Sequence, residues 1–266
     1  MIQEKLNKLI SFLEKTNSLA VAFSGGVDST FLLYMAKRHV KKNVIAITSV
    51  SEIHKKTDIK QAEAITKEMR ITHVEIDTKE LSIPEFIENS KDRCYWCKKN
   101  MYKRFIDLAK KHKISVLAHG ANLDDMQDYR PGNKAAEELG VIAPLAYAGF
   151  KKIEIRCMAK RLGLDVWNKP SSPCLATRIP YGHKITKEKL KMIEKAESAL
   201  KELGFTRFRV RHYGELAKIE VPERALSNVL KMRKQISSAF KKIGFLFVSL
   251  DIEGFSSGKL NRALNL

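Results

Sequence analysis

The sequence predicts an α/β protein with a doubly wound parallel sheet, followed by a small C-terminal α+β domain. Four apolar segments read as buried strands separated by helical patterns, as in βαβ units: residues 19–23, 43–49, 71–76 and 114–120. A glycine-rich turn links the first strand to a helix, and beyond residue 183 the pattern becomes strand, strand, helix, strand. We therefore expect two domains, residues 1–182 and 183–266.

Composition narrows the function classes. The chain has 266 residues, with 49 Lys and Arg against 30 Asp and Glu, a net charge of +19. This excess suits a polyanion or a phosphorylated small molecule, and a Lys-rich composition of thermophilic type explains it equally well. No apolar run reaches the roughly 20 residues of a membrane span, and no signal-peptide pattern opens the chain. We expect a soluble, cytoplasmic protein.

Further elements follow from periodicity and capping residues. Residues 1–17, 57–69, 98–112 and 153–162 read as helices, and 141–145 as a short strand. Cys157 lies among apolar neighbours of its helix, so we expect it in the core. Thr186 is placed to cap the N-terminus of the helix that opens the second domain.

The turn from Ser24 to Ser29 has the composition of an anion-binding loop. Adjacent glycines allow backbone amides to approach a ligand closely, and the helix that follows presents unpaired N–H groups. Asp28 suits such a loop when a divalent cation bridges it to phosphates. The Gly-Lys-Ser/Thr end of a Walker A sequence and the Gly-x-Gly-x-x-Gly fingerprint are both missing. A simple Gly-Gly turn is the alternative.

The strand order brings further residues to the same edge of the sheet. Ligands of doubly wound sheets bind outside the carboxyl ends of the strands, where the loop at 24–29, Ser49 and Gly120 should meet. The segment after Gly120 carries several carboxylates and Arg130, with Asp128 among them. Its place favours metal or substrate binding, and a solvated acidic loop is the alternative.

Three cysteines are candidates for chemistry. Cys94 and Cys97 form a Cys-x-x-Cys pair, which suits zinc, an iron–sulfur cluster or a redox pair, and buried core cysteines remain an alternative. Cys174 lies on a proline-rich loop near Arg178, whose charge could favour a nucleophilic or metal-binding thiolate.

A basic strand stands out in the second domain. Residues 207–212 alternate, with basic side chains on one face that include Arg209 and Arg211. Forked guanidinium donors bind phosphate well, whereas an exposed basic face of a strand is the simpler interpretation.

Taken together, these motifs resemble the LarE family of ATP-dependent sulfur transferases. The resemblance rests on Ser24–Ser29, which matches the pyrophosphate loop (PP-loop) of ATP pyrophosphatases, and on four further segments: 128–132, 173–182, 209–211 and 254–261. It covers nearly the whole chain. It implies the adenine nucleotide alpha-hydrolase-like fold, the activation of a carboxylate of pyridinium-3,5-biscarboxylic acid mononucleotide by adenylation, and a role in maturing the nickel-pincer nucleotide cofactor of lactate racemase. A homo-oligomer, a hexamer, is also implied.

Two sulfur sources are known in the resembled family. In one, a cysteine gives up its own sulfur and becomes dehydroalanine, and that position matches Cys174. In the other, three cysteines hold a [4Fe-4S] cluster whose open iron carries an extra sulfide. Because this chain also has Cys94 and Cys97, it is similar to the cluster type, and we expect Cys94, Cys97 and Cys174 as ligands. Zinc on the same cysteines is a further alternative.

The resemblance also assigns the remaining site residues. ATP and Mg²⁺ would be held by residues around the loop: Ala22, Phe23, Ser24, Gly25, Gly26, Asp28, Ser29, Ser49 and Gly120. Arg209, Arg211, Asp128 and Arg130 would contact the mononucleotide, and Arg178 would assist Cys174 and Asp28 in the chemistry. Glu197 and Glu220 match metal-binding positions of the family, with surface charges as the alternative.

Other members of the superfamily are the competing interpretations. A tRNA-thiolating enzyme would share the loop and the cysteines, but no added RNA-binding domain is visible, so a nucleic-acid partner is not expected. An amide-forming synthetase would not need three cysteines. A non-catalytic nucleotide-binding module would bind ATP without releasing pyrophosphate. The sequence identifies no sulfur donor.

Overall fold

The computed structural model describes residues 2–127, 131–256 and 258–264. The chain divides into two compact units, residues 1–80 with 94–172 and residues 81–93 with 173–266. In the described residues, no helix is both long and apolar enough to cross a membrane.

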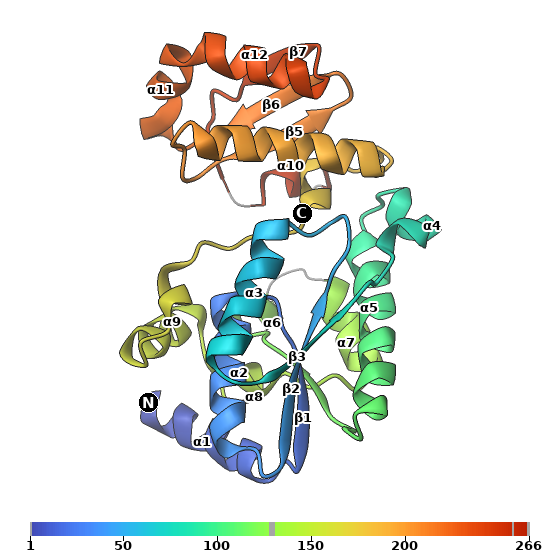
Figure 1. Ribbon diagram of the computed structural model, residues 1–266, viewed down its shortest axis with the longest axis vertical. Helices are drawn as coiled ribbons and strands as arrows, with labels where there is room; N and C mark the ends of the chain where they lie inside the picture. Colours follow the sequence, from blue (N-terminus) through green and yellow to red (C-terminus); the bar gives the residue numbers. More distant parts are fainter. Residues whose placement is uncertain (1, 128–130, 257, 265–266) are drawn as a thin grey trace. The chain divides into compact units, whose positions relative to one another are not determined.

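The first unit is built on a four-stranded parallel sheet in the order β3-β2-β1-β4 (Figure 1). Its strands are β1 (Ser18–Ala22), β2 (Asn43–Ser49), β3 (Thr72–Ile76) and β4 (Leu117–His119). The order reverses between β1 and β4, so the carboxyl end of β1 is the switch point at which doubly wound sheets bind ligands. This confirms the predicted fold class.

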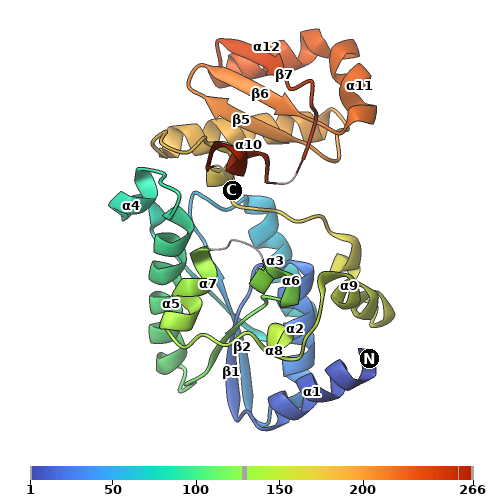
Figure 2. The ribbon, with the colours of Figure 1, turned by 180° about the vertical axis from the view of Figure 1, so that it is seen from behind.

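Helices cover both faces of this sheet (Figures 1 and 2). One face packs on α1 (Ile2–Glu14), α2 (Val27–His39), α3 (Lys56–Glu68) and α9 (Lys152–Arg161), and the other on α5 (Arg93–Lys111) and α7 (Pro131–Glu138). Successive residues of β1 and β2 point to opposite faces, with Val21 in one core and Ala20 and Ile45 in the other. Because both faces are covered, these strands read as continuous apolar runs.

The path after β4 differs from the prediction. The segment at 141–145 is not a strand: Ile142 makes a single bridge to Ala118, and α8 (Pro144–Tyr147) begins at once. Pro144 lacks a donor for a sheet ladder, but its fixed φ suits a first helical turn. The acidic segment after Gly120 also contains a short helix, α6 (Leu123–Gln127).

The second unit includes a short segment from the first half of the chain, residues 81–93. Residues 81–93 hold α4 (Pro84–Ile87), preceded by η1 (Glu80–Ser82). Asn89 Nδ2 donates to the carbonyls of Ile179, Pro180 and His183 at 3.3, 2.7 and 2.9 Å. These bonds join residues 179–183 to residues 81–93, which form the second unit together with residues 173–266.

A three-stranded mixed sheet forms the rest of the second unit, in the order β5-β6-β7. β5 (Arg209–Tyr213) pairs antiparallel with β6 (Leu216–Glu220), which pairs parallel with β7 (Phe247–Leu250). Its apolar face packs on α10 (Lys187–Glu202) and α12 (Arg233–Ile243), with α11 (Leu226–Lys231) leading into α12 (Figure 2). The hydroxyl of Thr186 accepts from the amide of Lys189 at 3.3 Å, which confirms it as the N-cap of α10.

Candidate active site

The loop between β1 and α2 has the geometry of an anion cradle. Gly25 adopts a φ of +65°, which disfavours any side chain there. Ser29 is buried, and its Oγ donates to the carbonyl of Gly26 at 3.1 Å and lies 3.2 Å from Oγ of Ser24. The loop is therefore pre-formed around the N-terminus of α2, where anions bind favourably.

Gly120 lets the end of β4 approach this loop. A Cβ atom at position 120 would lie 2.9 Å from the backbone nitrogen of Ser29 and 3.1 Å from its Cα. Backbone cannot move aside as a flexible side chain does. Only glycine at position 120 therefore allows the end of β4 to pack against the first turn of α2.

Asp28 is held by two residues from other elements. Its Oδ1 accepts from Nδ2 of Asn122 at 3.3 Å, and its Oδ2 makes a close ion pair with Nζ of Lys152. The backbone amide of Lys152 in turn donates to Oδ2 of Asp124 at 2.8 Å. Lys152, the first residue of α9, therefore places its ammonium group beside the Asp28 carboxylate, which is expected to position Mg²⁺.

A second lysine contacts the same loop. Nζ of Lys169 donates to the carbonyl of Gly25 at 3.3 Å and pairs with Oδ1 of Asp58 at 3.0 Å. Oδ2 of Asp58 also accepts from the hydroxyl of Ser172 at 2.8 Å. The sequence analysis missed Lys152 and Lys169, because nothing in a chain with 49 basic residues distinguishes these two.

Two residues that are expected to hold ATP, Ala22 and Ser49, lie at the ends of β1 and β2. The amide of Phe23 donates to the carbonyl of Ile47 at 2.8 Å, and the Phe23 carbonyl accepts from the hydroxyl of Thr48 at 2.8 Å. Both strand ends are therefore fixed side by side, with Ala22 half-buried between them and the loop.

Ser49 is buried, and its hydroxyl makes a short contact with Oγ1 of Thr78, which itself donates to Oε1 of the fully buried Glu80 at 2.5 Å. Its side chain is thus occupied within the fold. Any contact of Ser49 with ATP would therefore involve its backbone.

The Cys-x-x-Cys pair lies on a helix. The structure corrects the predicted helix start: α5 begins at Arg93, five residues before the expected Lys98, and contains both cysteines. Residues three apart share one helix face, so both half-exposed thiols point to the same side. Cys157 is exposed on α9, so its predicted place in the core is wrong.

Cys174 belongs to the second unit, where Arg178 organises its loop. Nη1 of Arg178 donates to the carbonyls of Pro173 at 2.8 Å and Cys174 at 3.2 Å. Its Nε and Nη2 bind Oε1 and Oε2 of Glu197 at 2.8 and 3.2 Å, in an ion pair that is almost fully buried. Cys174 precedes the short turn η3 (Leu175–Arg178) and is half-exposed.

A second buried ion pair extends this network. Nε and Nη2 of Arg211 bind Oε1 and Oε2 of Glu220, both at 2.9 Å, and Nη1 of Arg211 donates to the carbonyl of Thr177 at 2.7 Å. Glu197 and Glu220 thus serve as partners of arginines, a role that the sequence analysis did not anticipate. Two arginines and two glutamates hold the loop of Cys174 on β5 and α10.

Arg209 differs from its two arginine neighbours. It is 9 % exposed, lies 4.6 Å over the ring of Phe255 and donates from Nη1 to the carbonyl of Ser256 at 3.5 Å. Burial and then the charges of Arg211 and Arg178 lower the pKa of Arg209 to about 10. A guanidinium in such surroundings favours an anion beside it.

Two predicted substrate residues, Asp128 and Arg130, lie outside the described residues. Within those that are described, no group of three or more His, Cys, Asp and Glu side chains is arranged to hold a metal ion.

Comparison with known proteins decides the family. A PP-loop domain model matches residues 1–128. Over 96 % of this chain and 93 % of the relative, the sequence is 34 % identical to a Lactiplantibacillus plantarum protein named pyridinium-3,5-bisthiocarboxylic acid mononucleotide synthase. The chain belongs to the LarE family. This confirms the predicted resemblance. The protein is therefore an ATP-using sulfur transferase, which binds ATP with Mg²⁺.

Two further relatives match nearly the full chain. An uncharacterized Synechocystis protein is 38 % identical over 99 % of both chains, and one from Methanocaldococcus jannaschii is 30 % identical over 96 % of this chain and 98 % of the relative. The matched regions therefore include the second unit, beyond the residues matched by the PP-loop model.

Proposed function

We propose that this protein adenylates a carboxylate of pyridinium-3,5-biscarboxylic acid mononucleotide and replaces one carboxylate oxygen by sulfur, for nickel-pincer nucleotide synthesis. The observation that carries the proposal is full-length similarity to the pyridinium-3,5-bisthiocarboxylic acid mononucleotide synthase, together with a pre-formed phosphate loop at the switch point. Such a reaction would form the thiocarboxylate needed in lactate racemase maturation.

The residues around the loop would handle ATP. Amides of Gly25, Gly26 and Ser29 would contact the phosphates, and Asp28 would hold Mg²⁺, which neutralises phosphate charge when bound. Lys152 and Lys169 already lie on Asp28 and Gly25. With Asp28 as a Mg²⁺ ligand, the ammonium of Lys152 would contact the phosphates of ATP.

The activation step follows from this arrangement. A substrate carboxylate oxygen attacks the α-phosphorus of ATP, the bond from that phosphorus to the bridging oxygen breaks, and pyrophosphate leaves. A sulfur nucleophile then attacks the acyl carbon of the adenylate. AMP leaves with the bonding electron pair, and a thiocarboxyl group remains.

Cys174 is the proposed centre of sulfur transfer, held by the carbonyl contacts of Arg178. If the cysteine itself is the donor, its Sγ forms a thioester. Loss of the Cα proton and cleavage of the Cβ–Sγ bond then give the thiocarboxylate and dehydroalanine.

Three cysteine thiolates are also the kind of ligand set that a [4Fe-4S] cluster takes. Cys94 and Cys97 share a helix face, and these two thiols and that of Cys174 are half-exposed. Three thiolates would hold the cluster, and its open iron would supply an extra sulfide when bound.

Iron, acid-labile sulfide and zinc analysis after anaerobic purification separates these sources. The cluster proposal predicts about four irons per chain, as its name implies, lost in Cys94→Ala, Cys97→Ala and Cys174→Ala but retained in Cys157→Ala. Zinc in place of iron, or iron that survives all three substitutions, contradicts it.

Arg209 is the proposed phosphate-binding residue of the second unit. Nε and Nη2 of Arg211 both bind the carboxylate of Glu220. The guanidinium of Arg209, among the interactions found in the described residues, contacts one ring over which it lies and one carbonyl, and is bound to no carboxylate. Arg211 would then support the site by holding Thr177. The hexamer implied by the resemblance stays a prediction.

Pyrophosphate release tests the proposed function. Wild-type protein with ATP and Mg²⁺ should release pyrophosphate only when the biscarboxylate mononucleotide is added. Asp28→Asn should lower the rate at least about a hundredfold, equivalent to about 3 kcal/mol of transition-state stabilisation, while exposed Asp107→Asn should not. Release that needs tRNA instead of the mononucleotide would replace this proposal by a tRNA-thiolating function.

A further inference from the structure

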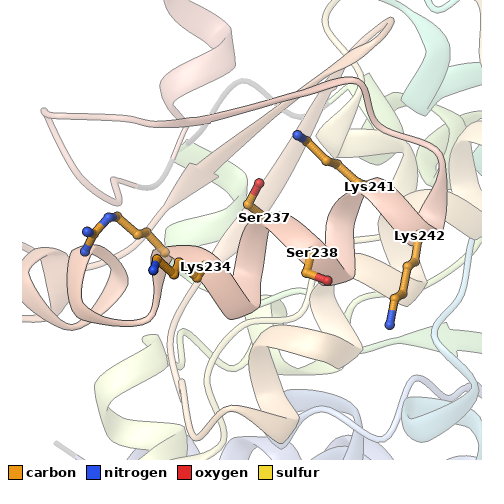
Figure 3. A pocket seen from close by; sticks show the side chains of 6 residues that line it. Lys234, Ser237, Ser238, Lys241 and Lys242 are labelled. Carbon is orange, nitrogen blue, oxygen red and sulfur yellow. The ribbon is translucent and has the colours of Figure 1, made fainter.

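Helix α12 of the second unit carries a basic groove on its exposed side. The lining residues are Arg233, Lys234, Ser237, Ser238, Lys241 and Lys242 (Figure 3). Figure 3 shows Lys234 toward one end of the helix, the two serines in its middle, and Lys241 and Lys242 at the other end. We call these six residues the α12 groove.

No acidic residue lies near the α12 groove in the sequence to balance its positive charge. From Arg224 to Leu250 the sequence contains six Lys and Arg and no Asp or Glu. The four cations of the groove are exposed, and in the described part of the chain none of them forms an ion pair with a carboxylate. Elsewhere on the same unit, Lys218 and Lys259 are paired with Asp251.

The chemistry of the lining indicates the kind of partner. Protein interfaces are enriched in aromatic residues and methionine and depleted in lysine and serine, so this groove has the wrong composition for a protein. A membrane surface would require apolar side chains among the cations. Lys, Arg and Ser side chains are instead the usual donors to phosphate oxygens of nucleic acids.

The spacing favours a duplex over a single strand. Arg233 and Lys242, at the two ends of the groove, are nine positions apart. This is about 13.5 Å along a helix, close to the width of the major groove of B-DNA. No aromatic side chain lines the groove, so unstacked bases would find no stacking platform. We propose that the α12 groove docks the phosphate backbone of a nucleic-acid duplex, independently of sequence.

This proposal goes beyond sulfur transfer and does not depend on it. The sequence alone disfavours a nucleic-acid partner because no added RNA-binding domain is visible. The groove supplies a surface that needs no such domain.

Binding of short labelled duplex DNA and duplex RNA, measured by fluorescence anisotropy between about 50 and 200 mM salt, tests the proposal. Lys234→Glu/Lys241→Glu reverses one cation at each end of the groove. The matched control is Lys191→Glu/Lys195→Glu, which makes the same charge change at exposed positions of α10.

The groove variant should bind at least about tenfold more weakly than wild type, with the slope of log K against log salt reduced by about 2. The control variant should keep most of the affinity and slope. Comparison of the DNA and RNA arms identifies the duplex.

Equal losses in the two variants would mean that net charge alone drives binding and would overturn the proposal. It would also be overturned if wild type binds neither duplex at about 50 mM salt, or if only a polyglutamate peptide or phosphatidylserine vesicles bind the groove. Circular dichroism of both variants confirms that each is folded.

Discussion

The guanidinium of Arg178 donates two hydrogen bonds, of 2.8 and 3.2 Å, to the carboxylate of Glu197 in the interior of the second unit. The same guanidinium donates to the backbone carbonyl of Cys174. The position of the predicted sulfur-transfer residue therefore depends on an ion pair that the solvent does not reach.

Breaking this ion pair on one side should destabilise the protein strongly. Arg178→Met leaves the buried Glu197 without its cation, which should lower the free energy of unfolding by about 3–5 kcal/mol. Arg178→Met/Glu197→Leu should recover much of the loss, because no buried charge then remains unpaired. Urea denaturation provides the measurement, and Lys184→Met, which breaks the exposed pair with Glu88, is the control with an effect of about 0–1 kcal/mol. Similar losses in the single and double variants would show that the pair itself is not what matters.

Arg209 should govern mononucleotide affinity. Arg209→Gln removes the guanidinium that we propose to bind the substrate phosphate, so KM for the mononucleotide should rise about tenfold or more, with folding retained. Arg211→Gln should instead lower the unfolding temperature, because Glu220 loses its partner. Steady-state pyrophosphate release at varied mononucleotide gives KM. An unchanged KM in Arg209→Gln would remove this residue from the site.

Lys152 should contribute to ATP binding. Lys152→Ala removes the ammonium that lies on Asp28, and we expect ATP affinity in the presence of Mg²⁺ to fall about tenfold, as for loss of one charged phosphate contact. Lys151→Ala, at the exposed neighbouring position, is the matched control. Isothermal titration calorimetry measures both. If the two variants bind ATP equally well, the ion pair with Asp28 is structural.

His212 should make the stability of the second unit pH-dependent. The pKa of the His212 imidazole is lowered to about 4, mainly by burial and then by the charge of Lys189. The centre of this ring lies 5.2 Å from the centre of the Phe245 ring. The unfolded chain binds a proton near pH 6.5 that the folded chain refuses until about pH 4. The free energy of unfolding should therefore fall as the pH drops from about 6.5 to about 4.

His212→Phe should flatten that dependence, whereas exposed His112→Gln should leave it unchanged. Thermal unfolding over this pH range is the measurement. A His212→Phe variant with the wild-type slope would assign the effect to other groups, such as His119, whose pKa burial also lowers to about 4.

Local patterns predicted the parts of the fold that local forces determine. The strand, glycine turn and helix around Ser24–Ser29 follow from apolar runs and backbone freedom, and Thr186 from its capping hydroxyl. The errors concern contacts between distant segments. Cys157 lies on the exposed side of α9, and Pro144 begins a helix where a strand was expected.

The candidate site shows the same division. The sequence proposes the loop, the cysteines and Arg209 as candidates, because each belongs to a recognisable motif. It could not identify Lys152 on Asp28, or Asn89 holding residues 179–183, because these contacts join residues more than 90 positions apart. The pairing of Glu197 and Glu220 with arginines was hidden for a different reason. These partners lie only 19 and 9 positions apart, but a single sequence records charge and not burial.

The most direct test of sulfur transfer is the mass of the nucleotide product. Anaerobic wild-type protein with ATP, Mg²⁺ and the biscarboxylate mononucleotide should yield a product in which sulfur replaces one oxygen, with one AMP formed for each sulfur inserted. The Cys157→Ala variant should match it, and Cys174→Ala should form none. A product from Cys174→Ala equal to that of wild type, or AMP formation that leaves the nucleotide without sulfur, would contradict the account.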